Sequence, residues 1–180
     1  MRFHHVFSLP LLALARLLGL TELQQLSSGR TASYHHFDRV KPVAVAYGCL
    51  LFFDTVLVSR LKVGLRLVMG KTVICDRFTY DTLVDFMIST DKHDITDSFI
   101  ARCFLSLAAH AIAVILMATP PTLRGRRKDV QEDRYLEWKI ELYSDLSKLC
   151  KIPVIYCEGS IQEVHLSILR ILDVAKVHEC

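Results

Sequence analysis

The sequence lacks an uninterrupted apolar run of the length that a membrane-spanning helix needs, which is about 20 residues. The longest apolar run, Phe104 to Ala118, is shorter than this and contains His110. The run Val43 to Val58 is interrupted by Asp54, and the run Leu9 to Leu20 is shorter still. We therefore expect no transmembrane span. A small membrane-associated protein that uses Leu9 to Leu20 and Val43 to Val58 stays as an alternative.

Several motifs of catalytic and metal-binding proteins are absent as well. The six cysteines form no CxxC pair, no histidine cluster completes a metal site, and neither GxSxG nor HExxH occurs. Several of the cysteines stand inside apolar runs, where cysteine behaves as a small hydrophobic residue. We expect reduced thiols and a cytoplasmic location.

The composition indicates an ordinary globular domain. The chain has 180 residues, of which 52% are hydrophobic and 23% charged, so a packed core is expected. The formal net charge of +3 is too small to argue for a nucleic-acid partner. We expect one domain over residues 1–180.

Short apolar runs alternate with longer amphipathic ones, which predicts an α/β fold. Helices are predicted at Leu9–Leu18, Pro42–Leu67, Thr79–Ser89, Asp97–Ala109 and Ile161–Val174. A further helix is predicted from the apolar positions Leu136, Ile140, Tyr143, Leu146 and Leu149. Short strands are predicted at Phe3–Ser8, Thr72–Cys75, Ala111–Ala118 and Pro153–Cys157. Loops are predicted at Ser27–Lys41 and Arg124–Asp129. Ser160 and Glu163 have the spacing of a capping box before the last helix.

The first candidate for chemistry is the pair Asp76-Arg77, directly after the predicted strand Thr72–Cys75. A guanidinium offers a fixed fork of donors that matches a phosphate group. A neighbouring carboxylate can orient that arginine or help to hold Mg²⁺. The alternative is an ion pair that only terminates the strand.

The second candidate is the basic segment Arg124 to Asp129. Four cations stand close together there, and Gly125 lets the segment flex. A mobile basic lid that closes over phosphates has this composition. The alternative is a solvated surface loop.

These residues, in this order, resemble the thymidylate kinases, in particular archaeal thymidylate kinase-like proteins, and the resemblance is strongest over residues 47–172. Gly70 to Phe78 is similar to the strand and DR(Y/F) motif of that family. Arg126 to Asp129 is similar to its lid, and Cys157 to Val164 is similar to its adenine loop and final helix.

The resemblance implies an ATP-dependent phosphoryl transfer from Mg²⁺-bound ATP to a nucleoside monophosphate, dTMP giving dTDP. It implies catalytic roles for Asp76, Arg77, Arg126 and Arg127, and a role for Asp76 in metal binding. It implies a lid formed by Arg124, Arg126, Arg127 and Lys128. It implies substrate binding by Arg77, Tyr80, Thr82 and Asp54. A homodimer is compatible with it.

The family motif GxxxxGK[ST] is missing. The one Gly-Lys-Thr, at Gly70 to Thr72, has Leu65 where the upstream glycine belongs, and it precedes a predicted strand instead of following one. The fold expected is therefore a three-layer P-loop NTPase-like parallel sheet flanked by helices, without its first strand and P-loop. Turnover needs that phosphate cradle. A non-catalytic nucleotide-binding remnant or interaction module is accordingly the alternative function.

Overall fold

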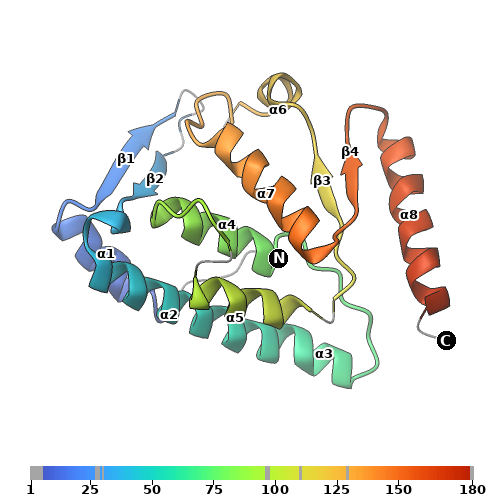
Figure 1. The fold of residues 1–180 in the computed structure, drawn as a ribbon, viewed down its shortest axis with the longest axis horizontal. Helices are drawn as coiled ribbons and strands as arrows, with labels where there is room; N and C mark the ends of the chain where they lie inside the picture. Colours follow the sequence, from blue (N-terminus) through green and yellow to red (C-terminus); the bar gives the residue numbers. More distant parts are fainter. Residues whose placement is uncertain are drawn as a thin grey trace. The chain divides into compact units, whose positions relative to one another are not determined.

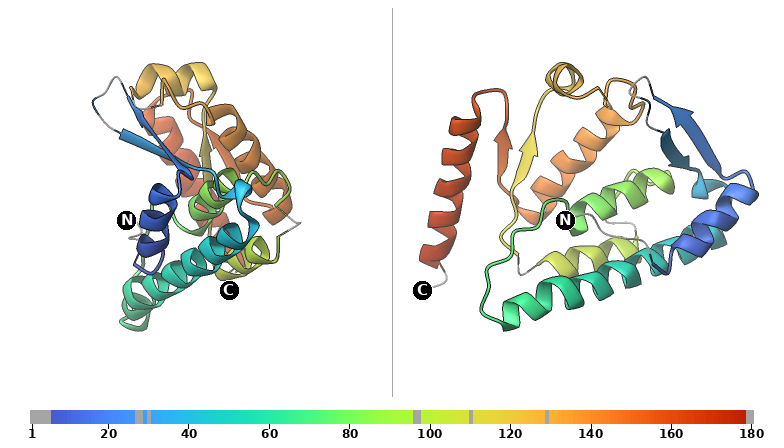
Figure 2. Two further views of the ribbon diagram at one scale, coloured as in Figure 1. Left: turned by 90° about the vertical axis from the view of Figure 1, so that its left-hand side faces the viewer. Right: turned by 180° about the vertical axis from the view of Figure 1, so that it is seen from behind.

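A computed structural model describes residues 6–26, 29, 31–95, 98–109, 111–128 and 130–178. The chain divides into two compact units (Figures 1 and 2). Unit 1 comprises Met1–Gln24 and Thr31–Ala109, and unit 2 comprises Gln25–Arg30 and His110–Cys180. The described part is mixed α/β, mostly helical, with two small two-stranded sheets, one of which is parallel.

Unit 1 is largely helical. It contains helices α1 (Leu9–Leu17), α2 (Lys41–Val58), α3 (Leu65–Val68), α4 (Thr79–Ser89) and α5 (Phe99–Ala108). A π-helical turn, η2 (Ser59–Gly64), joins α2 to α3, so that the three form one long rod. A two-stranded sheet of β1 (Thr21–Gln25) and β2 (Thr31–His35) is followed by the 3-10 turn η1 (Phe37–Arg39).

The core of unit 1 is formed where α2, α4 and α5 meet. The rings of Phe37 and Tyr47 lie 4.5 Å apart between centroids, and those of Tyr47 and Phe86 lie 6.3 Å apart. On α5, the Phe104 ring meets Phe52 edge-on at 5.4 Å. Buried aromatic pairs of this kind contribute both apolar area and a preferred orientation. The rings therefore fix how the helices pack.

Unit 2 is built on the parallel strands β3 (Ile115–Met117) and β4 (Val154–Tyr156), paired in the register Met117 to Tyr156. Between them the chain forms α6 (Pro120–Arg126) and α7 (Leu136–Cys150), and α8 (Ile161–His178) follows β4. Such a connection through helices is what parallel strands require. The apolar residues Ile115, Ile155, Leu142 and Leu146 are buried.

The predicted helices are found, with Pro42–Leu67 divided into α2, η2 and α3. The helix predicted at Asp97–Ala109 is found as α5, Phe99–Ala108, and Asp97 lies outside the described residues. The capping box is confirmed. Glu163 accepts a hydrogen bond from the Ser160 backbone N–H at 2.8 Å, and the Glu163 N–H donates to the Ser160 hydroxyl at 3.3 Å. The strands predicted at Ala111–Ala118 and Pro153–Cys157 are found in shortened form as β3 and β4.

The strand prediction at Thr72–Cys75 is wrong. These residues are described and form no strand, and the Ile74 side chain is 91% exposed. A strand needs a hydrogen-bonding neighbour, and no described segment pairs with this one. The parallel sheet in the described part is therefore β3 and β4 alone. Residues 3–5 of the strand predicted at Phe3–Ser8 lie outside the described residues, and Val6–Ser8 form no strand.

Two loop predictions also need correction. Ser27–Lys41 contains β2 and η1, because Thr31–His35 alternates between exposed and half-buried side chains. In the predicted loop Arg124–Asp129, the first three residues belong to α6. Pro120 and Pro121 start that helix, since proline suits the first turn, where its missing N–H is not needed. The basic segment is thus partly helical.

Candidate functional site

The most informative place in unit 1 is the turn that leads into α4. It carries Asp76 and Arg77, and α4 then begins at Thr79. Arg77 has a φ of 55°, in the left-handed region that a non-glycine residue adopts at a cost of roughly 1–2 kcal/mol. Backbone strain of this kind concentrates at functional sites. The Arg77 side chain is exposed and makes no ion pair with any described residue.

The start of α4 has two features of an anion site. Its N-cap residue, Phe78, gives no side-chain cap, and the helix is 11 residues long. The positive end of a helix dipole and its first N–H groups bind anions. In addition, the Thr79 hydroxyl is fully buried and has no hydrogen-bond partner in the described part of the chain. A small buried water would satisfy such a group.

The two other predicted substrate-binding residues of α4 lie on the same turn. Tyr80 and Thr82 are both partly exposed, and the Thr82 hydroxyl donates to the Phe78 carbonyl at 3.3 Å. Asp76 and Arg77 thus directly precede α4, and Tyr80 and Thr82 lie in its first turn, where two positions apart they point to different sides. The burial of Thr79 could not be predicted from the sequence, because threonine is mostly exposed in proteins.

Asp54, also predicted to bind substrate, is used by the chain itself. Its carboxylate accepts the backbone N–H groups of Val6 (3.0 Å), Phe7 (2.7 Å) and Ser8 (3.0 Å), and the Ser8 hydroxyl at 2.7 Å. Burial acts to raise the pKa of Asp54, but the hydrogen bonds from Ser8, Phe7 and Val6 lower it below its ordinary value. Asp54 thus anchors the start of α1.

Unit 2 carries a second polar cluster, at the carboxyl ends of its parallel strands. Thr119 follows β3 and Glu158 follows β4. The Thr119 N–H donates to Glu158 Oε1 at 2.6 Å, and the Thr122 hydroxyl donates to Glu158 Oε2 at 2.6 Å. In parallel sheets of α/β proteins, this is the end where ligands bind.

The electrostatics of this cluster keep Glu158 ionised. Hydrogen bonds from the Thr122 hydroxyl and the Thr119 backbone, with a smaller effect of Arg126, lower the pKa of the exposed Glu158 carboxyl. Arg126 Nη1 donates to the Cys157 carbonyl oxygen at 2.6 Å. The arginine is thus held beside the strand ends by the loop after β4.

The other predicted lid residues stand on α6 or just after it. Arg124 pairs with Glu137 of α7 at 2.6 Å. Arg127 and Lys128 follow the end of α6 and are exposed. Because Arg124 and Arg126 are tied to neighbouring elements, two of the four predicted lid cations belong to a fixed helix.

The described residues provide little for a metal ion alone. They contain no group of three or more His, Cys, Asp or Glu side chains that could hold one. Asp76 is a single carboxylate, and Mg²⁺ is commonly bound by one or two carboxylates together with substrate phosphates. Asp76 therefore fits Mg²⁺ only when a phosphate ester is bound beside it.

The segment Gly70 to Thr72 does not fit the triphosphate of ATP. The Gly70 N–H donates to the Leu67 carbonyl at 2.9 Å, and the Lys71 N–H donates to the Arg66 carbonyl at 3.0 Å. Both groups terminate α3, and an irregular segment follows them. A P-loop needs such N–H groups pointing at phosphate oxygens, at the start of a helix.

Comparison of this chain with protein-family models, with curated proteins and with solved structures gave no match.

Proposed function

We propose that this chain is a thymidylate kinase-like protein that binds a nucleoside monophosphate at the start of α4. The observation that carries the proposal is an exposed Arg77, which makes no ion pair with a described residue, directly before a helix whose N-cap residue Phe78 gives no side-chain hydrogen bond. Arg77 would hold two phosphate oxygens through its guanidinium fork. The first N–H groups of α4 would favour the same negative charge.

A more specific version of this proposal adds a three-layer P-loop NTPase-like fold and the transfer of a phosphoryl group from ATP to dTMP. Asp76 would orient Arg77 and share Mg²⁺ with the phosphates, and Arg126 and Arg127 would balance charge on the transferring group. The one Gly-Lys-Thr, at Gly70 to Thr72, does not suit the ATP triphosphate, so binding without turnover is the form that we favour for these 180 residues.

Isothermal titration calorimetry with dTMP, dUMP, AMP and inorganic phosphate tests the binding proposal. We expect Arg77→Ala to weaken binding of the preferred monophosphate about 10- to 100-fold, since a charge-assisted bidentate contact is lost. Arg102→Ala is the matched control, because Arg102 is an exposed cation of α5 in the same unit. No heat with any monophosphate, or an equal loss in both variants, would overturn the proposal.

A phosphotransfer assay with ATP, Mg²⁺ and dTMP separates the two forms of the proposal. We expect the wild-type chain to give no more dTDP than Arg77→Ala. Product above that control would show that the chain is a working kinase and would contradict binding without turnover.

A further inference from the structure

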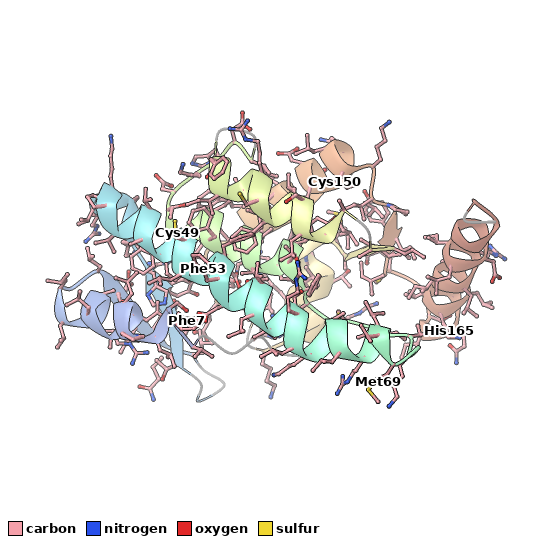
Figure 3. The ribbon with its side chains drawn as sticks, turned by 90° about the horizontal axis from the view of Figure 1, so that it is seen from below. Phe7, Cys49, Phe53, Met69, Cys150 and His165 are labelled. Carbon is pink, nitrogen blue, oxygen red and sulfur yellow. The ribbon has the colours of Figure 1, made fainter. Side chains whose placement is uncertain are left out.

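The rod formed by α2, η2 and α3 has an unusual combination of composition and exposure. Over Lys41–Val68 it is long and apolar enough to cross a membrane, with a mean hydropathy of 1.8 in its most apolar window. In a core helix of a soluble protein most of that window would be buried, whereas here 33% is. In Figure 3 the rod runs across the view, past the labelled Cys49 and Phe53 to Met69. Much of its apolar surface therefore faces outward.

The exposure is greatest at the far end of the rod. Residues 65–72 are all exposed, with Val68 at 88% and Met69 at 66%. Leu61 and Leu65 are also more than half exposed. Spacings of four and three place Leu61, Leu65 and Val68 on one side of the rod. In Figures 1 and 2 this end extends past the end of α5 within unit 1.

The same end carries an unbalanced positive charge. From Thr55 to Cys75 the sequence contains four cations, Arg60, Lys62, Arg66 and Lys71, and no acidic residue. None of the four makes an ion pair with a described residue. Lys62 and Arg66, four apart, lie beside the apolar side formed by the leucines. Each of these two successive turns thus carries one leucine and one cation, Leu61 with Lys62 and Leu65 with Arg66.

We propose that residues 59–71, which we call the basic-apolar end, bind the surface of an anionic lipid bilayer. Helices that lie in a membrane interface combine an apolar face with lysine and arginine, and anionic headgroups attract those cations. A protein partner fits less well, because the cores of protein interfaces are depleted in charge. The occupant is therefore the interface of a membrane.

The basic-apolar end lies on the membrane and does not cross it. A span over the most apolar part of the rod, Val43 to Val58, would place the Asp54 carboxylate in the hydrocarbon, which costs about 2.5 kcal/mol or more for a charge at the centre. The α2 part is also held in unit 1, since Asp54 is buried and binds the backbone of Val6, Phe7 and Ser8. In an interfacial position the cations meet the anionic headgroups, and the contacts of Asp54 in unit 1 are kept.

Flotation of the purified 180-residue chain with vesicles tests this inference. Vesicles of phosphatidylcholine and phosphatidylglycerol in equal parts should carry the protein upward, and vesicles of phosphatidylcholine alone should not. High salt should release it, because screening shortens the reach of the headgroup charge. Equal flotation with both vesicles, or none with either, would overturn the proposal.

Two variants with matched controls test whether the basic-apolar end is the part of the protein that binds the membrane. Arg66→Gln should lower partitioning about fivefold, the amount expected for one cation near an anionic surface. Val68→Asp should lower it by more than about tenfold, since a buried apolar group is replaced by a repelled charge. The controls Arg170→Gln and Ile161→Asp change exposed residues of α8 in the same way and should float like the wild type. Controls that fall as far as the variants would contradict the assignment.

Two further outcomes would contradict binding of the basic-apolar end to a lipid surface. A wild-type dimer in sedimentation velocity that Val68→Asp dissociates, without any flotation, would assign this surface to a second copy of the chain. Resistance to alkaline carbonate extraction would assign it to a spanning helix. Monomer in solution and extraction by carbonate are the results expected here. Monophosphate binding depends on Arg77, so these tests and those of the proposed function succeed or fail separately.

Discussion

Asp54 is the one acidic residue between Lys41 and Cys75, and it lies inside the most apolar helix of the chain. The side chain is 3% exposed, and both of its oxygens accept hydrogen bonds from residues 6–8. An ionised buried carboxylate is stable only when it is bonded in this way. At the scale of single residues, this anchor ties the start of α1 to α2.

Asp54→Asn is expected to destabilise the protein by about 2 kcal/mol, because an amide cannot accept the same charge-assisted hydrogen bonds. Urea unfolding followed by far-UV circular dichroism measures this change. Asp38→Asn serves as the control, since Asp38 is exposed and makes no hydrogen bond with another described residue. Equal stability of the two variants would mean that the anchor contributes nothing.

The pH dependence of stability follows from the same carboxylate. The folded pKa of Asp54 lies below its ordinary value of 3.8, so its contribution is present above that value and is lost as the pH falls through the folded pKa. The difference in unfolding free energy between wild type and Asp54→Asn should therefore be constant near neutral pH and shrink below about pH 4. A difference that grows on acidification would contradict this account.

At this scale the sequence allowed Asp76 and Arg77 to be selected, because an acid and an arginine after an apolar run are visible as a pattern. It did not show that the Asp54 carboxylate binds the backbone of residues 6–8, or that the Thr79 hydroxyl is buried. Both facts depend on which atoms lie around the side chain after folding, and neither leaves a local pattern in the sequence.

Helix packing in unit 1 rests on a close approach at Gly48. A Cβ atom at this position would lie 2.7 Å from the side chains of Ile100 on α5 and Phe86 on α4. Gly48→Ala is therefore expected to destabilise unit 1 by about 1–3 kcal/mol through overpacking. At Gly64 in η2 the nearest atom is the Ser59 carbonyl oxygen at 3.8 Å, so Gly64→Ala should be neutral or slightly stabilising. Denaturant unfolding of the pair measures both, and similar losses at the two glycines would contradict the packing.

The end of α7 offers a second test at the scale of elements. Lys151 has a φ of 52°, in the left-handed region, directly after the helix. Lys151→Gly should stabilise the protein by roughly 1 kcal/mol, because glycine adopts this conformation without strain. Lys148→Gly, inside α7, should destabilise it by about the same amount through lost helix propensity. Thermal unfolding of the two variants should therefore shift in opposite directions.

Most helices were predictable from the sequence, although α6 was not, and two of the four predicted strands are found, as β3 and β4. A helix is specified by its own apolar spacing and end signals, as with the Ser160–Glu163 capping box of α8. A strand needs a partner: Thr72–Cys75 has the composition of a strand, but no described segment pairs with it. Thr21–Gln25, a polar segment, is a strand because β2 lies beside it.

For the whole molecule, the sequence supports an α/β class and the structure agrees at that level. The complete parallel sheet implied by the resemblance remains a proposal, since the described part pairs only β3 with β4 in parallel. The candidate residues fall in both units, with Asp76 and Arg77 in unit 1 and Arg126 and Glu158 in unit 2. Monophosphate binding is therefore argued from unit 1 alone.

Backbone amide shifts in an NMR titration test the central claim most directly. The ¹⁵N-labelled chain would be titrated with dTMP and, separately, with thymidine, which has no phosphate. The account predicts that dTMP shifts the amides of residues 76–80 at the start of α4 most strongly, that thymidine does not, and that Arg77→Ala abolishes the effect. Equal shifts with thymidine, or dTMP shifts that leave residues 76–80 unchanged, would contradict it.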